Sequence, residues 1–411
     1  MNVSPEVEKE VERQFQILKY GTIEITPEED FKAMLRESIL KNRPLRVKCG
    51  IDPTNVDVHL GHLVPYRKMR LFQDLGHKGV VIIGDYTAQI GDPTGKIESR
   101  PHLSGEQVRE NAKNYMEQVY TVLDPQKTEI RYQSEWFNDV GLKDVIKWCA
   151  QTTVAKLISH DTFKTRLEKG TPLGLHEFLY PVLQGVDSVY VESDVELGGS
   201  DQKFNVLMGR DFQKNANLRP QVAMLLPIIT GLDGVQKMSK SLANYIAVWD
   251  EPFNKFGKVM SIPDNLMVQY FQFVANLNEA DVKKMEADIN SNAIHPNEAK
   301  KQLATKVVAL FHGEDVAKKM REQFESVFAK GNIPDDVDEV TYTLNKTLID
   351  LLGEANVLPS KSEIKRMFVQ NAVTIVDGDK LTDPQLKLDA AFNGKVIKIG
   401  KRKFLRLKLG N

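Results

Sequence analysis

Short apolar runs alternate with amphipathic stretches in the N-terminal part of this chain. The spacing of Val7, Val11, Phe15 and Leu18 predicts helix within residues 1–40. Within that span, Thr26-Pro27-Glu28-Glu29 has the composition of a helix start, with Thr26 as N-cap, proline in the first helical position and acids in the first turn.

A strand, a helix and a second strand are predicted next. Residues 46–51 form the first strand, and residues 62–75 form a helix with Gly76 just beyond its end. The run Val80-Val81-Ile82-Ile83 is typical of a strand buried on both faces of a parallel sheet. This order predicts an α/β fold with a doubly wound, Rossmann-like parallel sheet, whose ligand binds at the carboxyl ends of the strands.

The pattern divides the remaining chain into further segments. Residues 249–330 are predicted to form an α-helical domain after a first domain over residues 1–248, because apolar residues between Pro296 and Phe328 keep helical spacing. Residues 331–340 are rich in Gly, Pro and Asp and predict a linker. Residues 341–411 resume with two predicted helices and several short strands, as in a small α+β domain.

Composition places the chain among ordinary globular proteins. Its 411 residues carry 55 Lys+Arg and 56 Asp+Glu, with 41% hydrophobic and 27% charged residues. No apolar run is long enough for a transmembrane helix, and the N-terminus lacks the regions of a signal peptide, so we expect a cytoplasmic protein without a membrane partner. Cys49 and Cys149 form neither a disulfide framework nor a zinc motif.

The charge is unevenly distributed along the chain. Residues 341–411 have a net charge of +6 and residues 1–340 a net charge of −7. The last stretch contains seven basic residues with no acid between them, namely Lys395, Lys398, Lys401, Arg402, Lys403, Arg406 and Lys408. Such a run is either a solvated surface or a site for a polyanion.

The first candidate cluster lies at the mouth of the βαβ unit. Gly50-Ile51-Asp52-Pro53-Thr54 is followed by His59-Leu60-Gly61-His62 at the predicted helix start. Two histidines at a helix N-terminus favour an anionic ligand, and Gly61 leaves room for a flat base against the backbone. A metal pair and simple capping are the alternatives, although neither cysteine has a ligand-like spacing from the histidines.

A second cluster, Gly91-Asp92-Pro93-Thr94-Gly95-Lys96 with Arg100, superficially resembles a P-loop. Only three residues separate its glycines where four are required, and Ile97 stands where Ser or Thr would bind magnesium. Lys96 and Arg100 are instead suited to close over a polyphosphate as mobile cations, unless the segment is a plain exposed loop.

The third cluster runs from Glu177 to Gln202. Tyr180, Gln184 and Asp187 share one face of an otherwise apolar helix, so they need polar partners from the protein or from a ligand. Leu197-Gly198-Gly199-Ser200-Asp201-Gln202 then places glycines at a strand end and an aspartate suited to a ribose hydroxyl.

The most specific feature is Lys237-Met238-Ser239-Lys240-Ser241. Its two lysines are flexible point charges suited to a transferring pyrophosphate. Together with His59-Leu60-Gly61-His62, this pentapeptide resembles the paired signatures of class I aminoacyl-tRNA synthetases. The intervening clusters are similar to those of the tyrosyl-tRNA synthetase family, in its bacterial branch with this Lys-Met-Ser-Lys-Ser spelling. The C-terminal 70 residues, including residues 358–366, resemble a small RNA-binding module shared with a small-subunit ribosomal protein.

The resemblance implies an enzyme that joins tyrosine to ATP and transfers the tyrosyl group to the terminal ribose of its tRNA. ATP, with Mg²⁺, is then a substrate, tRNA(Tyr) and tyrosine are partners, the chain forms a homodimer, and no tightly bound metal or organic cofactor is expected. The implied catalytic residues are Thr54, His59, His62, Lys96, Arg100, Lys237 and Lys240. The implied ATP-binding residues are Gly50, Asp52, His59, Gly61, His62, Gly199, Asp201 and Lys240.

For tyrosine, the resemblance implies Asp92, Tyr180 and Gln184 at the α-amino group, Gln202 near the carboxylate and Asp187 at the phenolic hydroxyl. Phenylalanine would leave the buried Asp187 unpaired, which is the established basis of discrimination in this family. Two positions depart from the pattern. Many relatives have a tyrosine two residues before the glycine equivalent to Gly50, where this chain has Lys48. Pro65 likewise replaces a threonine of some relatives.

Three alternatives stay open at this level. A tryptophanyl synthetase shares the architecture, although Asp187 and the basic tail favour tyrosine. An RNA-binding or splicing protein would keep the scaffold without catalysis, but both signatures are intact. A nucleotidyltransferase for a small cofactor precursor would not need residues 250–411.

Overall fold

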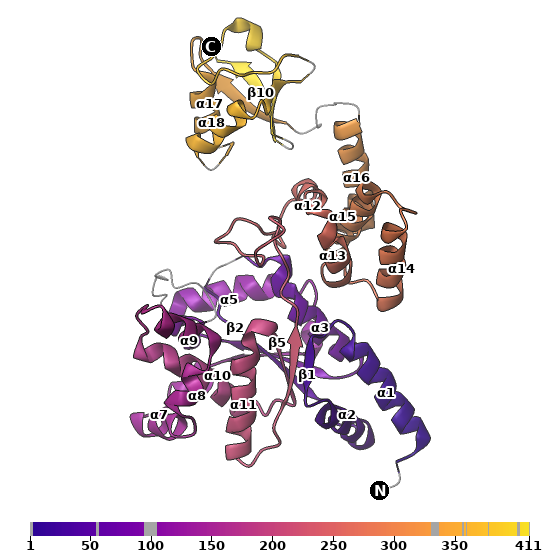
Figure 1. Ribbon diagram of the computed structural model, residues 1–411, viewed down its shortest axis with the longest axis vertical. Helices are drawn as coiled ribbons and strands as arrows, with labels where there is room; N and C mark the ends of the chain where they lie inside the picture. Colours follow the sequence, from indigo (N-terminus) through magenta and orange to yellow (C-terminus); the bar gives the residue numbers. More distant parts are fainter. Residues whose placement is uncertain are drawn as a thin grey trace. The chain divides into compact units, whose positions relative to one another are not determined.

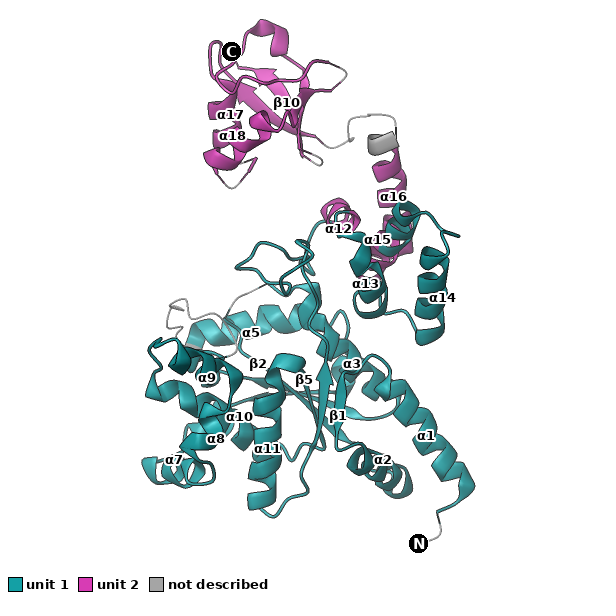
Figure 2. Cartoon of the chain, viewed as in Figure 1, with its two compact units in different colours: residues 1–251, 261–303 teal, residues 252–260, 304–411 magenta. Residues whose placement is uncertain are grey.

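The computed structural model divides into two compact units, residues 1–251 with 261–303 and residues 252–260 with 304–411 (Figure 2). The structure describes residues 3–54, 57–93, 105–329, 337–355, 357–358, 360–376, 378–400 and 403–410. The predicted domain division at residues 248, 330 and 340 stays a prediction.

The first unit is built on a six-stranded sheet in the order β1-β6-β5-β2-β3-β4. Its strands are β1 Glu24–Thr26, β2 Arg46–Ile51, β3 Lys78–Ile83, β4 Thr128–Tyr132, β5 Val195–Gly199 and β6 Val222–Leu226. All neighbours are parallel except β1, which pairs antiparallel with β6. The predicted doubly wound α/β sheet is confirmed, with one antiparallel edge strand added.

Helices cover both faces of this sheet (Figure 1). On one face, Val80 and Ile82 of β3 pack in one core cluster with Val182 and Val186 of α10 (Leu179–Tyr190) and with residues of α11 (Lys203–Asn215). On the other face, a side chain at Gly79 would collide with Met69 of α3 (Leu63–Asp74). Alternate positions along β3 therefore face opposite helical layers, as a strand buried on both faces requires.

Further described helices belong to this unit. They are α1 Pro5–Lys19, α2 Glu28–Lys41, α4 Thr87–Ile90, α5 Gly105–Val119, α6 Ser134–Phe137, α7 Leu142–Cys149, α8 Val154–Ile158, α9 Asp161–Glu168, α13 Met267–Phe273 and α14 Glu279–Asn290. Single 3₁₀ turns lie at η1 Leu60–His62, η2 Pro125–Lys127, η3 Leu175–Phe178, η4 Ser200–Gln202 and η5 Asp264–Leu266.

The predicted helix within residues 1–40 is interrupted by β1, and the predicted N-cap is wrong. Thr26 is the last residue of β1, where it pairs with Ala223, and its hydroxyl donates to Glu24 Oε1 at 2.6 Å. Pro27 takes the N-cap position of α2 and makes no side-chain capping bond. The strand has only three residues, too few for a period-two pattern to reveal it.

The second unit contains α12 Pro252–Met260 and α16 Glu314–Ala329, while α15 Pro296–His312 has residues in both units. Its C-terminal part is a four-stranded sheet in the order β7-β10-β9-β8 with α17 Leu348–Glu354, α18 Lys361–Val369 and the 3₁₀ turn η6 Ala390–Phe392. The strands are β7 Asp338–Tyr342, β8 Val373–Ile375, β9 Val396–Ile399 and β10 Lys403–Leu409. β7 begins inside the predicted linker and pairs parallel with β10.

Candidate active site

The four sequence clusters converge at the carboxyl ends of the parallel strands. Asp52 follows β2, Asp92 follows β3 and α4, Asp201 follows β5, and Lys237 lies on the segment after β6. Because these strands are neighbours in one sheet, their C-terminal loops meet at one edge, which is where ligands of doubly wound folds bind.

The histidine pair stands at the start of α3. His59 precedes η1, and the His59 and His62 rings stack with centroids 3.5 Å apart. Burial, the largest effect, lowers the pKa of His59 to about 2 and the pKa of His62 to about 3. The nearby positive charge of Lys240 also lowers both pKa values. Both imidazoles are therefore neutral at pH 7 and offer hydrogen bonds rather than charge to an anion.

Gly61 is confined by the groups around it. A Cβ at this position would lie 3.1 Å from Nδ1 of His59 and 3.6 Å from Cβ of Met238. The N–H of Leu60 also donates to the carbonyl of Ile246 at 2.9 Å, shortly after the segment of residues 237–241. The structure thus brings together two motifs that are distant in the sequence.

The segment of residues 237–241, called the lysine loop below, is held by hydrogen bonds of its backbone. Met238 N donates to the Ile229 carbonyl and Ser239 N to Asn244 Oδ1, both at 2.8 Å. Lys237 Nζ lies 3.3 Å from Asp201 Oδ2. Burial is the main cause that lowers the pKa of the Lys240 ammonium, and Asp57 opposes the shift.

Asp52 links two of the clusters. Its carboxylate accepts a hydrogen bond from the Tyr180 hydroxyl at 2.9 Å and another from Thr87 Oγ1 at 2.7 Å. On a neighbouring loop, Gln202 Nε2 donates to Asp92 Oδ2 at 2.6 Å. The predicted amino-group ligands are therefore already organised by protein partners.

Asp187 lies buried on α10 beside a polar pair that the sequence analysis missed. Gln133 Nε2 donates to its Oδ2 at 2.8 Å, and Trp136 Nε1 donates to its Oδ1 at 3.2 Å. Burial is the largest effect and raises the pKa of Asp187 to about 7; the positive charge of Lys48 opposes it and the negative charge of Glu196 adds to it. Gln133 and Trp136 follow β4, and no spacing in the sequence connects them to α10.

Lys48 and Glu196 form a second unexpected feature. They sit opposite each other on β2 and β5, with Lys48 Nζ 3.0 Å from Glu196 Oε1 and both side chains almost fully buried. Gln184 Nε2 donates to the same carboxylate oxygen at 3.0 Å. The sequence does carry a signal for this pair, because Lys48 and Glu196 are charged residues inside two apolar strands. A buried charge needs a partner, so two such residues of opposite sign are expected to pair.

The remaining predicted residues are placed as follows. Thr54 N donates to the Asp52 carbonyl at 2.7 Å, and Gly50 is exposed with no atom near a built Cβ. Gly199 precedes η4, where a Cβ would lie 2.8 Å from Asp201 Oδ1. Lys96 and Arg100 lie outside the described residues.

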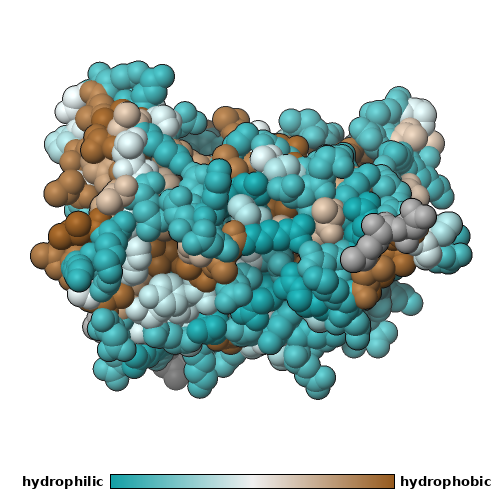
Figure 3. Space-filling view, turned by 90° about the horizontal axis from the view of Figure 1, so that it is seen from below, coloured by the Kyte–Doolittle hydropathy of each residue, from teal (hydrophilic) through white to brown (hydrophobic). Residues whose placement is uncertain are grey.

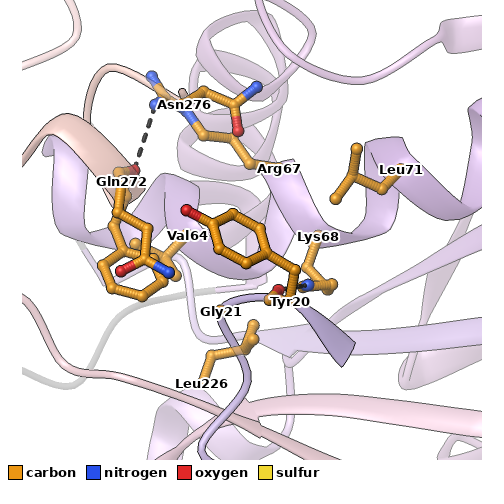
Figure 4. A pocket seen from close by; sticks show the side chains of 10 residues that line it. Tyr20, Gly21, Val64, Arg67, Lys68, Leu71, Leu226, Gln272 and Asn276 are labelled. Carbon is orange, nitrogen blue, oxygen red and sulfur yellow. Dashed lines mark hydrogen bonds between the residues drawn. The ribbon is translucent and has the colours of Figure 1, made fainter. Parts of the chain in front are cut away.

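A small cavity of about 40 Å³ lies elsewhere in the first unit and shares no residue with the predicted site (Figure 4). Arg67 and Lys68 reach it from α3. Lys68 Nζ donates to the Leu18 and Tyr20 carbonyls, and the Arg67 guanidinium donates to the Phe273 and Val274 carbonyls. These cations bind backbone carbonyls of neighbouring segments, which is a structural role.

Comparison with known proteins agrees with this geometry. Residues 40–329 match the family model described as tRNA synthetases class I (W and Y). The chain is 45% identical over 402 residues to a tyrosine–tRNA ligase of Moorella thermoacetica, covering 98% of this chain and 97% of that one. It is 44% identical to the tyrosine–tRNA ligase of Aquifex aeolicus, covering 97% and 99%.

The chain belongs to the tyrosyl-tRNA synthetase family. Solved members share its fold at lower identity. The truncated mitochondrial tyrosyl-tRNA synthetase of Aspergillus nidulans has a TM-score of 0.62 at 21% identity and covers 79% of this chain and 100% of that one. The Archaeoglobus fulgidus enzyme complexed with L-tyrosine has a TM-score of 0.60 at 21% identity, covering 76% and 99%.

The described ranges contain neither a metal-binding cluster nor a membrane-spanning helix. They contain no group of three or more His, Cys, Asp or Glu side chains placed to hold a metal ion. Within the same ranges, every helix is too short or too polar to cross a lipid bilayer.

Proposed function

We propose that this synthetase activates tyrosine with ATP to tyrosyl-adenylate and pyrophosphate, and then transfers the tyrosyl group to the 3′-terminal ribose of tRNA(Tyr). The observation that carries the proposal is the identity of 42–45% to tyrosine–tRNA ligases over nearly the whole chain. The buried carboxylate of Asp187, ready to accept a phenolic proton, supports tyrosine as the amino acid.

Tyrosine would bind across the face of α10. Its phenolic hydroxyl donates to Asp187, and its ammonium group meets Asp92, Tyr180 and Gln184. Gln202, which already bonds Asp92, lies toward the carboxylate. Each of these polar groups is fixed by a protein partner before substrate arrives, so little reorganisation opposes binding.

The reaction needs no protein nucleophile. A carboxylate oxygen of tyrosine attacks the α-phosphorus of ATP, a P–O bond forms, and the bond to the β-phosphate oxygen breaks with its electron pair leaving on pyrophosphate. Neutral His59 and His62 supply hydrogen bonds to the phosphates, with Thr54 beside them. Lys237 and Lys240 supply the positive charge as negative charge moves to the leaving group.

The nucleoside would lie over the glycines. Gly50 leaves room for the base at the backbone, with Asp52 nearby, whereas the side-chain space at Gly61 is taken by His59 and Met238, so Gly61 would contact ATP through its backbone. Gly199 opens the turn before Asp201, which holds the ribose and exchanges its bond to Lys237 for that contact. Lys96 and Arg100 act as further cations in this proposal, on the sequence motif alone.

Mg²⁺ would enter with ATP. The residues assigned to the phosphates, His59, His62, Lys237 and Lys240, are nitrogen donors and cations, whereas Mg²⁺ takes oxygen ligands. Among the described residues, no three His, Cys, Asp or Glu side chains gather to hold a metal ion. The protein residues therefore do not fit a dedicated magnesium site, and the phosphates of ATP are the better ligands.

For tRNA, we assign residues 249–330 to the anticodon side and residues 341–411 to RNA binding. On β10, exposed Arg406 and Lys408 alternate with buried Leu405 and Leu407, so over residues 405–408 the exposed face of the strand carries positive charge. That face suits a phosphate backbone. A cytoplasmic location accompanies this role.

We also propose a homodimer through α7, α8 and α9. Large apolar side chains are exposed there and at the start of η3, namely Leu142, Ile146, Val154, Leu167 and Leu175, with exposed fractions from 47% to 84%. In Figure 3, hydrophobic side chains gather on the left of the view, the side on which Figure 1 draws these helices. An exposed apolar patch of this kind marks an interaction surface.

Leu142→Asp with Ile146→Asp should convert a dimer to a monomer in sedimentation velocity, whereas a wild-type monomer would contradict the assignment.

The decisive experiment is exchange of labelled pyrophosphate into ATP with tyrosine, tryptophan and phenylalanine in separate reactions. Exchange should require tyrosine. Exchange with tryptophan alone would identify a tryptophanyl enzyme, and none with any of the three would reject the proposed function.

A further inference from the structure

The Lys48–Glu196 pair lies directly beneath the polar face of α10. Lys48 Nζ donates to Ser188 Oγ at 2.8 Å and to the Gln184 carbonyl at 3.1 Å, and it pairs with Glu196. Ser188 Oγ and Gln221 Nε2 donate to the second oxygen of Glu196. Both charges are thus fully hydrogen-bonded inside the protein, which is what makes a buried pair tolerable.

The position of Glu196 determines which way the Gln184 side chain can point. A primary amide has a donor end and an acceptor end, whereas an ionised carboxylate only accepts. With Glu196 ionised by its pairing with Lys48, the amide must turn its NH₂ group toward Glu196 Oε1, and this is the observed bond of 3.0 Å. The acceptor Oε1 of Gln184 is then directed away from the pair.

That acceptor is available for a ligand. Within the part of the chain that the structure describes, no hydrogen bond to Gln184 Oε1 occurs, and the side chain is only partly buried. An oxygen acceptor matches an ammonium group, which has three donors and no acceptor. The opposite amide orientation would present two N–H donors to the same cation and repel it.

We propose that the Lys48–Glu196 pair is a positioning element that fixes the orientation of the Gln184 amide and so selects a ligand with a free α-ammonium group. The inference rests on the proposed function only in taking tyrosine as that ligand. Glu196 and Lys48 act through Gln184 and need not touch the substrate themselves.

The test compares two ligands that differ only at the amino group. Tyrosine and 3-(4-hydroxyphenyl)propionate, which lacks the ammonium, are titrated calorimetrically into wild type and Glu196→Gln. The variant keeps the shape of residue 196 but allows the Gln184 amide to flip. Tyrosine affinity should fall tenfold or more, while the affinity for the desamino ligand should change less than twofold.

Several controls separate positioning from stability. Arg46 lies on β2, the strand that carries Lys48, and its Nη1 is 3.0 Å from Oε2 of Glu129 on β4. Glu129→Gln removes the charge of this partner and should leave both affinities unchanged. Lys48→Met with Glu196→Gln removes both charges without leaving one unpaired, and it should reproduce the loss for tyrosine alone. In a Gln184→Met background, Glu196→Gln should cause no further loss, because the two residues act in series.

The outcomes are distinct. Equal losses for both ligands, or no loss for either, would overturn the inference and leave the pair as a structural element. Pyrophosphate exchange by wild type is measured in parallel. If wild type fails to exchange with tyrosine, the proposed function fails independently of this result.

Discussion

At the scale of single residues, the ionisation of Asp187 connects stability with substrate choice. Burial raises the pKa of this carboxyl from 3.8 to about 7. Because the folded pKa is the higher one, Asp187 contributes to stability fully below pH 4, and that contribution is lost as the pH rises through 7. The ionised form that accepts the phenolic proton is therefore the form that the fold disfavours.

Tyrosine affinity should consequently depend on pH. As the pH falls below 7, Asp187 becomes protonated and loses the charged form that accepts a hydrogen bond most strongly, so the Kd for tyrosine should rise about fivefold between pH 7 and pH 6. His59 and His62 stay neutral over this range because burial lowers their pKa values to about 2 and 3. Isothermal titration from pH 5 to 8 measures the profile, with ATP affinity as the control. A flat tyrosine profile would contradict the role of Asp187.

Many residues of the proposed site could be chosen from the sequence because local motifs mark them; their roles stay predictions. The polar face of Tyr180, Gln184 and Asp187 follows from helical spacing alone, and α10 bears it out. The partners of these residues were not predictable, since Gln133, Trp136 and Glu196 reach α10 only through sheet packing. A sequence gives the spacing within one element but not the pairing between elements.

At the scale of elements, the turn between β3 and α4 is tightly packed at Gly84, next to the proposed site. A Cβ at Gly84 would lie 2.2 Å from Asp52 Oδ1 and 2.3 Å from Thr87 Oγ1, inside the hydrogen bond that joins these two side chains. The β3–α4 turn thus packs against the loop after β2 without space for a methyl group.

Gly84→Ala should therefore destabilise the protein by about 2 kcal/mol, since a methyl group forced into a packed polar site displaces its neighbours. Urea unfolding monitored by tryptophan fluorescence gives the free energy of unfolding. Gly50→Ala on β2 is the matched stability control, because no atom lies within 4 Å of its built Cβ. Equal stability of both variants would show that the β3–α4 turn adjusts freely.

The lysine loop allows a kinetic prediction at the same scale. Lys240→Ala should lower the rate of pyrophosphate exchange roughly 10²-fold or more, because it removes a charge that acts on the developing pyrophosphate. Tyrosine binding should remain within twofold, since Lys240 makes no ground-state contact with the amino acid in the proposed mechanism. Lys203→Ala, which removes an exposed pair with Glu24, is the control. A parallel loss of tyrosine affinity would argue for a binding role.

Element prediction succeeded where the periodic pattern was long and failed where it was short. β2, α3 and β3 appear close to their predicted ranges, and Gly76 has the positive φ of 93° expected after a helix end. β1 was not predicted, because its three residues become a strand through pairing with β6 and have no distinctive pattern of their own. Tertiary pairing determines such short edge strands.

At the scale of the whole molecule, the net charge of −1 is the sum of an acidic part, residues 1–340, and a basic part, residues 341–411. The basic residues 341–411 include nearly all of a separate hydrophobic core, whose buried members run from Tyr342 to Leu407 and include Leu352, Phe368 and Ile397. β7 pairs with β10, so this folded part begins at Asp338 rather than at residue 341. A core made only of its own residues can be removed without opening another one.

Removal of residues 337–411 should accordingly separate the two half-reactions. Tyrosine-dependent pyrophosphate exchange should stay within twofold of wild type, because every predicted contact to tyrosine and ATP lies before residue 241. Charging of tRNA should fall, and its dependence on salt should become shallower, because fewer phosphate contacts release fewer counterions.

Arg406→Gln with Lys408→Gln in the full chain is the finer test, since it removes charge from the exposed face of β10 and leaves the buried face intact. If both variants charge tRNA with the wild-type salt slope, the basic tail is a solvated surface and the RNA contacts lie elsewhere.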